Sequence, residues 1–303
     1  MRKMVRLLCL LLCLALTLPA MAEETAEDGI LQIHQMMIGC ADGYLLRLGD
    51  FTLLIDGGEA NPRKPEGLVP AYLRAAGVTR LDAVIITHWH LDHCMNLNEV
   101  LREFGDEQTV VYSPAERVPQ EIFNGTVTVE IAPLATGVHQ QLLMGDELRF
   151  GGMTLTCVGP DTLSLGGGCN QDSLNLLMQY GSRRILFTGD FAQSRTISGE
   201  YSELCRGVDA LKFPHHGIEP FEIGTSALRV VSPEYVLVPG VVNKYKVWNF
   251  ADNMGVKFPR GNVLTNADGH VIILTDGAAR FEVLTQADPA DFAPQQVEGQ
   301  SGT

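Results

Sequence analysis

Short apolar runs alternate with helical spacings along the first part of the chain. The runs are rich in β-branched residues, as buried strands are, and the two helical segments are followed by Gly77 and Gly105, where glycine suits a helix end. The predicted strands are 31–38, 44–48, 52–55, 81–86 and 109–112, and the predicted helices are 68–76 and 96–104. This alternation is typical of a layered α/β fold.

The second part of the chain repeats this organisation with more strands. Gly151-Gly152, Gly181-Ser182 and Asp276-Gly277 lie between apolar runs and predict hairpin turns. The predicted strands are 127–131, 147–150, 153–158, 174–180, 184–188, 210–213, 235–238, 262–264, 270–274 and 280–284, with helices at 226–231 and 249–254. Two strand-rich halves, each carrying helices, predict a four-layer αββα sandwich.

One large domain accounts for most of the chain. The whole chain is 46% hydrophobic, residues 23–285 are long enough for a single large α/β domain, and no linker-like stretch divides them. Residues 286–303 are polar, with prolines and glycines, and are predicted to form a disordered tail.

Residues 1–22 have the organisation of a secretory signal peptide. A basic start precedes an apolar centre that is too short to span a bilayer, and a small-residue cleavage site follows. These parts are Arg2, Lys3 and Arg6, then residues 7–18, then Ala20-Met21-Ala22. We therefore expect a secreted, extracytoplasmic protein without a transmembrane anchor in its mature chain.

The charge of the chain restricts its partners. The net charge of −14 becomes about −17 without residues 1–22, which hold three basic residues and no acidic ones. Such an acidic surface repels polyanions and gives no sign of broad nucleic-acid binding. The acidic surface is still compatible with a phosphodiester substrate that is held locally by a metal ion.

Five cysteines follow residue 22, an odd number, so at least one thiol is unpaired within the chain. They are Cys40, Cys94, Cys157, Cys169 and Cys205. Cys94 directly follows the histidine cluster described next. A small buried residue is the preferred interpretation of Cys94, and a soft metal ligand is the alternative.

The segment Thr87-His88-Trp89-His90-Leu91-Asp92-His93 directly follows the predicted strand 81–86. In an extended or tightly turned segment, His88 and His90 point to the same side and can hold one cation. Asp92 and His93 then face a neighbouring metal position. Two divalent metal ions sharing a water would suit this arrangement. The alternative, a set of surface histidines, is disfavoured because further metal-capable residues follow later in the chain.

Two later strand ends also carry metal-capable residues. Gly189-Asp190 follows strand 184–188, and His215-His216 follows strand 210–213. An aspartate at the first position can point back into a pocket and bridge two metal ions. Three such clusters at strand ends make a much stronger signal than any one of them. Asp56-Gly57-Gly58 and the glycine run 166–168 are less specific and predict a turn and a flexible loop.

In this order, the H-x-H-x-D-H motif, Gly189-Asp190 and His215-His216-Gly217 resemble the metallo-β-lactamase-fold superfamily over residues 31–284. The closest likeness is to the hydrolase domain of ComEC-type competence proteins and their secreted relatives. The stretches that carry it are Gly39-Cys40-Ala41-Asp42-Gly43, Leu54-Ile55-Asp56-Gly57-Gly58, Asn170-Gln171-Asp172-Ser173-Leu174, Leu186-Phe187-Thr188-Gly189-Asp190 and Leu211-Lys212-Phe213-Pro214-His215-His216-Gly217.

The resemblance implies an αββα fold, two divalent metal ions and hydrolysis, in the competence group of phosphodiester bonds in DNA. It implies that His88 and His90 hold one metal ion, that Asp92 and His93 hold the other, and that Asp190 bridges them. Either His215 or His216 completes the set, with His216 slightly favoured. Zn²⁺ is the preferred metal and Mn²⁺ the alternative, because histidine and carboxylate ligands suit both.

The chain departs from the family pattern in three places. Asn170 and Ser173 occupy the region where many members supply a further histidine, which leaves one metal position with fewer ligands. Cys94-Met95-Asn96 replaces the common Ile-Gly-Gly, and Lys246-Val247-Trp248 replaces the Gly-His-Pro of the competence group. The last change removes a histidine expected near the substrate and affects catalysis more than metal binding.

The predicted function is metal-assisted hydrolysis in which Asp92 also orients or deprotonates the attacking water. Phosphodiester cleavage, of DNA or of a cell-wall polymer, is the first expectation. The alternatives are a cell-wall phosphate esterase, a β-lactamase-like amide hydrolase, and a non-catalytic metal-binding protein of the same fold.

Overall fold

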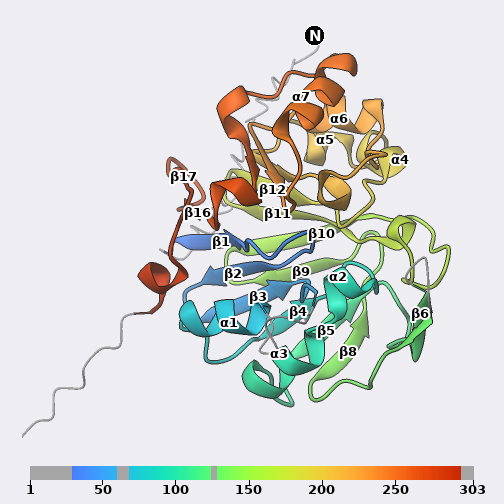
Figure 1. Cartoon of the computed structure of the whole chain (residues 1–303), viewed down its shortest axis with the longest axis vertical. Coiled ribbons are helices and arrows are strands. Elements are labelled where there is room, and N and C mark those ends of the chain that lie inside the picture. The colour runs from blue at the N-terminus through green and yellow to red at the C-terminus, as the bar shows by residue number, and fades with distance from the viewer. Residues whose placement is uncertain (1–28, 60–67, 124–127, 295–303) are drawn as a thin grey trace, which may run out of the picture.

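The computed structural model describes residues 29–59, 68–123 and 128–294 (Figure 1). Two large β-sheets face each other, and helices cover their outer faces, α1 and α3 on one side and α4 to α7 on the other. The predicted four-layer αββα sandwich is therefore confirmed. The predicted signal peptide lies outside the described residues.

The first sheet has eight strands in the order β17-β16-β1-β2-β3-β4-β5-β8. Its members are β1 (Leu31–Gln35), β2 (Tyr44–Leu48), β3 (Phe51–Ile55), β4 (Ala83–Ile85), β5 (Val110–Ser113), β8 (Val138–Gln141), β16 (Val271–Thr275) and β17 (Phe281–Leu284). Strands β3, β4, β5 and β8 run parallel. Their carboxyl ends consequently meet at one edge.

The second sheet has seven strands in the order β15-β14-β13-β12-β11-β10-β9. Its members are β9 (Glu147–Phe150), β10 (Met153–Gly159), β11 (Asn175–Tyr180), β12 (Arg183–Phe187), β13 (Ala210–Lys212), β14 (Tyr235–Val238) and β15 (Val263–Thr265). Strands β12 to β15 are parallel. A separate two-stranded sheet pairs β6 (Glu121–Phe123) with β7 (Thr128–Glu130).

Side chains that alternate along each strand build three apolar layers. On β3, Leu53 and Ile55 point between the sheets, whereas Leu54 points toward the helices. The outer helices are α1 (Leu68–Ala75) and α3 (Leu97–Phe104) on the first sheet, and α4 (Ser194–Ile197), α5 (Ser202–Cys205), α6 (Thr225–Val231) and α7 (Lys244–Asn253) on the second. The period of two along a strand explains how both faces of each sheet become buried.

Short elements such as β6, α4 and α5 were not predicted, and three further differences from the sequence prediction have a local explanation. Helix α7 begins at Lys244, well before the predicted start at residue 249, because the side chain of Asn243 accepts a hydrogen bond from the backbone N–H of Tyr245 and caps it. Strand β8 was not predicted, since its sequence is mostly polar and it lies at a sheet edge. The expected loss of order at Gln286 is wrong for residues 286–294. They include the 3₁₀ helix Pro289–Phe292, and the Phe292 carbonyl accepts a hydrogen bond from Arg47.

The described part of the chain contains no helix that is both long and apolar enough to cross a membrane.

Candidate metal centre

The predicted site residues gather where parallel strands of both sheets end. Asp56 follows β3, the histidine motif follows β4, Asp190 follows β12, and the 3₁₀ helix Pro214–Gly217 follows β13. Helix α2 (Leu91–Cys94) carries the last part of the motif. Segments more than 120 residues apart in the sequence thus contribute to one site, as with His216 and Asp92. The carboxyl edge of parallel strands is where α/β folds place their ligands.

One group of four side chains converges closely. Asp92, His93, Asp190 and His216 each offer one ligand atom, and these atoms lie within 4.8 Å of one another. Asp190 Oδ1 lies 3.1 Å from His93 Nε2 and 3.4 Å from His216 Nε2. Asp92 Oδ2 lies 3.2 Å from His216 Nε2. These spacings suit one divalent cation.

The second oxygen of Asp190 faces the other pair of histidines. Asp190 Oδ2 lies 3.9 Å from His88 Nε2, and the ring of His90 lies 4.7 Å from the ring of His88. The rings of His88 and His93 are 4.1 Å apart. Asp190 therefore stands between the two groups of ligands, where a bridging carboxylate belongs.

Several inward-facing atoms of this cluster have no hydrogen-bond partner within the described structure. They are His88 Nε2, His93 Nε2 and Asp190 Oδ1; all three are buried, and the last two have their 3.1 Å ion-pair contact with each other and the 3.4 Å and 3.6 Å approaches of His216 and Lys212 to Asp190. Buried polar atoms are normally paired, because an unpaired one loses its hydration without compensation. Imidazole nitrogens and a carboxylate oxygen turned toward a common point fit a divalent metal ion.

The outer nitrogen of His93 is fixed by a buried carboxylate. Its Nδ1 donates to Asp56 Oδ2 over 2.8 Å, and Thr87 donates to both oxygens of Asp56 over 2.7 Å. This contact holds the proton on Nδ1 and leaves Nε2 free to bind a metal ion. Sequence analysis placed Asp56 in a turn and in a stretch that carries the family resemblance, but gave it no role at the site.

A buried ammonium group lies on the other side of the cluster. Lys212, 1% exposed, places Nζ 2.5 Å from Asp42 Oδ2 and 3.6 Å from Asp190 Oδ1, and it also donates to the Gly189 carbonyl. Asp42 Oδ1 lies 3.2 Å from His216 Nδ1. Asp42 and Lys212 therefore connect His216 to Asp190. Both residues stand in the stretches that carried the family resemblance, but sequence reasoning gave them no role.

Burial and the neighbouring charges shift the pKa values of the cluster's histidines in opposite directions. Burial lowers the pKa of His88, and nearby His93 lowers it further. Burial also disfavours the charged form of His216, but Asp190 and Asp42 outweigh it and raise its pKa to about 10. For His93, the carboxylates of Asp190 and Asp56 likewise outweigh burial and hold the pKa well above its ordinary value. A metal ion held by these two histidines would have to displace protons.

The structure separates the two neighbouring histidines 215 and 216. His216 is 1% exposed and faces Asp92 and Asp190, whereas His215 lines the open cavity beside the cluster. Both have positive φ angles, 52° and 51°, which are uncommon for residues other than glycine. This backbone turn directs the two rings to different surroundings.

Ser173 lies where the family pattern often has a histidine. Its hydroxyl accepts a hydrogen bond from the Asp190 backbone N–H over 3.0 Å and lies 3.3 Å from His88 Nδ1. Gly189 makes this approach possible, since a Cβ there would come within 2.7 Å of the Ser173 side chain, and its φ is +53°. Ser173 thus orients two predicted ligands.

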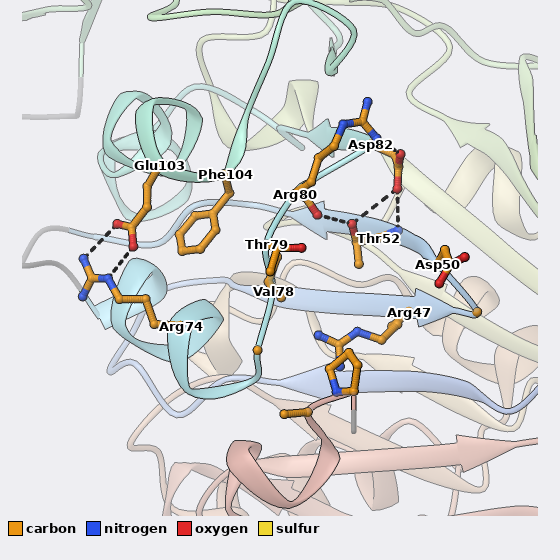
Figure 2. A pocket seen from close by; sticks show the side chains of 14 residues that line it. Arg47, Asp50, Thr52, Arg74, Val78, Thr79, Arg80, Asp82, Glu103 and Phe104 are labelled. Atoms are coloured by element: carbon orange, nitrogen blue, oxygen red, sulfur yellow. Dashed lines mark hydrogen bonds and ion pairs between the residues drawn. The ribbon is translucent and has the colours of Figure 1, made fainter. Parts of the chain in front are cut away.

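The cluster opens into a cavity of about 390 Å³ that His90, Asp92, Asn170, Asp190 and His215 help to line. A larger cavity, about 820 Å³, lies at the opposite ends of β3 and β4 (Figure 2). Its arginines already have partners: Arg74 pairs with Glu103, Arg80 with Asp82, and Arg47 donates to backbone carbonyls. The smaller cavity is therefore the candidate active site.

None of the five cysteines in the described chain forms a disulfide. Cys94 is 5% exposed, packs in the core beneath α3, and donates to the Trp89 carbonyl. Burial raises its pKa to about 12, which disfavours the thiolate that a metal would need.

The loop that contains the glycine run 166–168 is fixed, not flexible as predicted. The Asp172 carboxylate accepts hydrogen bonds from the backbone N–H groups of Ser164, Leu165 and Gly167.

The sequence-family model of the metallo-beta-lactamase superfamily matches residues 41–238 of this chain. The chain therefore belongs to that superfamily and is a metallo-hydrolase of the beta-lactamase superfamily by its family and fold. The relatives described next are not ComEC-type competence proteins, so the closer likeness stays a prediction.

Among curated proteins, the probable metallo-hydrolase YhfI of Bacillus subtilis is 42% identical over 55 residues, 18% of this chain and 20% of YhfI. The anti-Pycsar protein Apyc1 of a Paenibacillus species is 35% identical over 85 residues, 27% of this chain and 32% of Apyc1. The aligned parts thus span less than a third of either relative.

Among solved structures, Tm1679 is similar to this chain with a TM-score of 0.51 and 14% sequence identity. Tm1679 is a metal-dependent hydrolase of the beta-lactamase superfamily, and the match covers 78% of this chain and 95% of Tm1679. That likeness concerns the fold.

Proposed function

We propose that the protein is a secreted metal-dependent hydrolase of phosphodiester bonds that uses two divalent metal ions, Zn²⁺ in preference to Mn²⁺. The observation that carries the proposal is the position of Asp190 between His88 on one side and His93 and His216 on the other, with His88 Nε2 and His93 Nε2 buried and without a hydrogen-bond partner in the described structure. The secreted location rests on the signal-like residues 1–22.

In this proposal His88 and His90 would hold one metal ion, Asp92, His93 and His216 would hold the other, and Asp190, which lies between the two groups, would be available to both. The ions, when bound, would supply a water of lowered pKa and positive charge beside the scissile group. Each of three histidines is oriented by a contact to its Nδ1, the nitrogen turned away from the proposed metal positions. The contacting side chains are Asp56 for His93, Asp42 for His216 and Ser173 for His88.

Asp92 is suited to act on the attacking water. Its side chain is 31% exposed, whereas those of His93 and Asp190 are fully or almost fully buried. It lines the open cavity, and the histidines around it outweigh its burial and hold the pKa of its carboxyl below the usual range. An ionised carboxylate at the cavity can accept a proton from water.

Phosphodiester specificity is supported by the resemblance of the 170–174 and 211–217 stretches to the competence group. The acidic chain favours a compact ester over a long polyanion. A non-catalytic metal-binding role is the second candidate, favoured by Lys246-Val247-Trp248, which lie within helix α7 where the competence group has a histidine.

The test compares wild type with Asp92→Ala on a chromogenic phosphodiester, with Asp50→Ala as a control at an exposed turn. Asp92→Ala is expected to lower turnover by roughly 100-fold or more while the protein stays folded. Unchanged turnover in Asp92→Ala would rule out the mechanism. An absence of turnover in wild type loaded with either ion would favour the non-catalytic role.

A further inference from the structure

His215 lines the cavity at the candidate metal centre but is not one of the proposed metal ligands. It shares this cavity of about 390 Å³ with His90, Asp92 and Asp190, which do belong to the ligand groups. The ring of His215 lies 6.2 Å from the ring of His216, with an angle of 55° between the two planes. A molecule in this cavity therefore contacts His215 and the proposed ligands together.

The imidazole of His215 has no polar partner among the described residues. The next residue, His216, contacts the carboxylates of Asp42, Asp92 and Asp190, whereas the ring of His215 forms neither an ion pair nor a hydrogen bond there. Nδ1 of His215 is buried, but the residue as a whole is half-buried and lines the cavity. Nε2 is therefore the ring nitrogen through which His215 can bind a molecule in the cavity.

The backbone at His215 adopts a conformation that is unfavourable for an imidazole side chain. Its φ of 52° and ψ of 43° lie in the left-handed region, where the Cβ atom crowds the backbone. Glycine adopts this conformation without that cost. Strained residues of this kind gather at functional sites. At His216 the same conformation directs a proposed ligand to its carboxylates, but that role does not explain a histidine at residue 215.

Close packing fixes the turn that presents His215. The backbone N–H of Ile218 donates to the His215 carbonyl over 2.8 Å. A Cβ on Gly217 would come within 2.6 Å of a side chain of β14, and a Cβ on Gly240 would come within 2.4 Å of the His216 carbonyl oxygen. The position of the imidazole is thus set before a substrate arrives, as a substrate-positioning group requires.

A phosphodiester needs hydrogen-bond donors that the carboxylates of this cavity do not supply. Asp92 and Asp190, when ionised, only accept hydrogen bonds, and they repel an anionic ester that no cation neutralises. A neutral imidazole carries one N–H group, and hydrogen bonds to an ionised acceptor are the stronger kind. An N–H at Nε2 of His215 therefore suits an anionic oxygen of the substrate.

We propose that His215 is a substrate-contacting residue whose Nε2–H donates a hydrogen bond to a non-bridging oxygen of the phosphodiester. The proposal rests on the proposed hydrolysis of phosphodiesters and adds one residue to it. The metal ligands hold the ions, and His215 orients the anionic group beside them. The contact transfers no proton, so it does not require His215 to change its charge.

The first test compares wild type, His215→Ala and His215→Gln, all loaded with Zn²⁺, on methyl p-nitrophenyl phosphate. His215→Ala is expected to lower kcat/KM by roughly 10- to 100-fold, the effect of one hydrogen bond to a charged group, and to keep the metal content of wild type. His215→Gln again offers a side-chain N–H and should recover part of the loss. Unchanged kcat/KM in His215→Ala overturns the proposal, and so does a loss of bound metal, because the ring would then act as a ligand.

Two further variants separate a substrate contact from a structural role. His139→Ala is the matched control, a half-buried histidine on β8 outside the residues that line this cavity, and it should keep the kcat/KM of wild type. His215→Gly relieves the backbone strain, so it should unfold at a urea concentration no lower than wild type while its kcat/KM falls as in His215→Ala. Earlier unfolding with unchanged kcat/KM would assign the ring to the fold and refute the proposal.

A second test needs no turnover and separates this inference from the proposed function. Calorimetry measures the binding of dimethyl phosphate to Zn²⁺-loaded wild type, His215→Ala and His139→Ala. Binding that weakens by roughly 10-fold or more only in His215→Ala supports the contact even if no phosphodiester is hydrolysed, and in that case the proposed function alone fails. Equal binding and equal kcat/KM in wild type and His215→Ala, with turnover present, refute the contact and leave the proposed function standing. Neither binding nor turnover in wild type refutes both.

Discussion

Asp56 Oδ2 accepts a hydrogen bond from His93 Nδ1 over 2.8 Å, and both side chains are almost completely buried. The carboxylate fixes the orientation and tautomer of the imidazole, so that His93 Nε2 points to Asp190. The position of one proposed ligand thus depends on a residue that does not face the metal site.

Asp56→Asn should weaken metal binding by roughly 10- to 100-fold, because the amide supports the His93 ring less well than a carboxylate. Competition with a chromogenic chelator measures the affinity. Asp50→Asn, at an exposed turn, is the matched control and should bind metal as wild type does. An unchanged affinity in Asp56→Asn would contradict the role given to this contact.

His216→Ala and His215→Ala should behave differently although the residues are neighbours. His216 faces two carboxylates and is proposed as a ligand, so its loss should lower the affinity for metal by roughly 100-fold or more. His215 lines the cavity, and its loss should leave the metal content near that of wild type. Metal analysis after dialysis distinguishes them, and the reverse pattern would show that the ligand assignment is wrong.

Lys212→Met should destabilise the fold by about 3–5 kcal/mol, because the buried Asp42 carboxylate loses its ammonium partner and keeps only its contacts with His216 and His93. Urea unfolding of the metal-free proteins measures the free energy of unfolding. Asp42→Asn added to Lys212→Met should recover part of the loss. Lys246→Met is the control, since its ion pair with Glu219 is 60% and 56% exposed and is worth at most about 1 kcal/mol. Equal effects of the two lysine changes would contradict this interpretation.

The raised pKa of His216 predicts how the metal-free protein responds to pH. Its folded-state value of about 10 lies above the model value of 6.5, so protonated His216 stabilises the fold fully below pH 6.5. That stabilisation is lost as the pH rises toward 10. Unfolding free energies between pH 6 and pH 10 should therefore decline less in His216→Ala than in wild type.

The same raised pKa predicts proton release on metal binding. At pH 8 the metal-free site holds a proton on His216, and a divalent cation must displace it. Zn²⁺ added in weak buffer with a pH indicator should release at least one proton per chain, and His216→Ala should release fewer. Stoichiometric binding without proton release would contradict the assignment.

The sequence could predict the fold and most of the site because both depend on local patterns. Strand ends and the H-x-H-x-D-H spacing are visible within a few residues, and His88, His90, Asp92, His93, Asp190 and His216 do come together. The contacts of Asp42 and Lys212 join segments about 170 residues apart, and no local spacing reports them. The early start of α7 depended on the Asn243 cap rather than on apolar spacing.

The most direct test of the central claim is the metal content of the purified protein, measured together with hydrolysis of bis(p-nitrophenyl) phosphate before chelation, after it, and after Zn²⁺ or Mn²⁺ is restored. We expect about two metal ions per chain and a turnover that disappears with the metal and returns with it. Turnover that persists without metal, or two bound ions with no turnover under either metal, would contradict the account of a dinuclear phosphodiesterase.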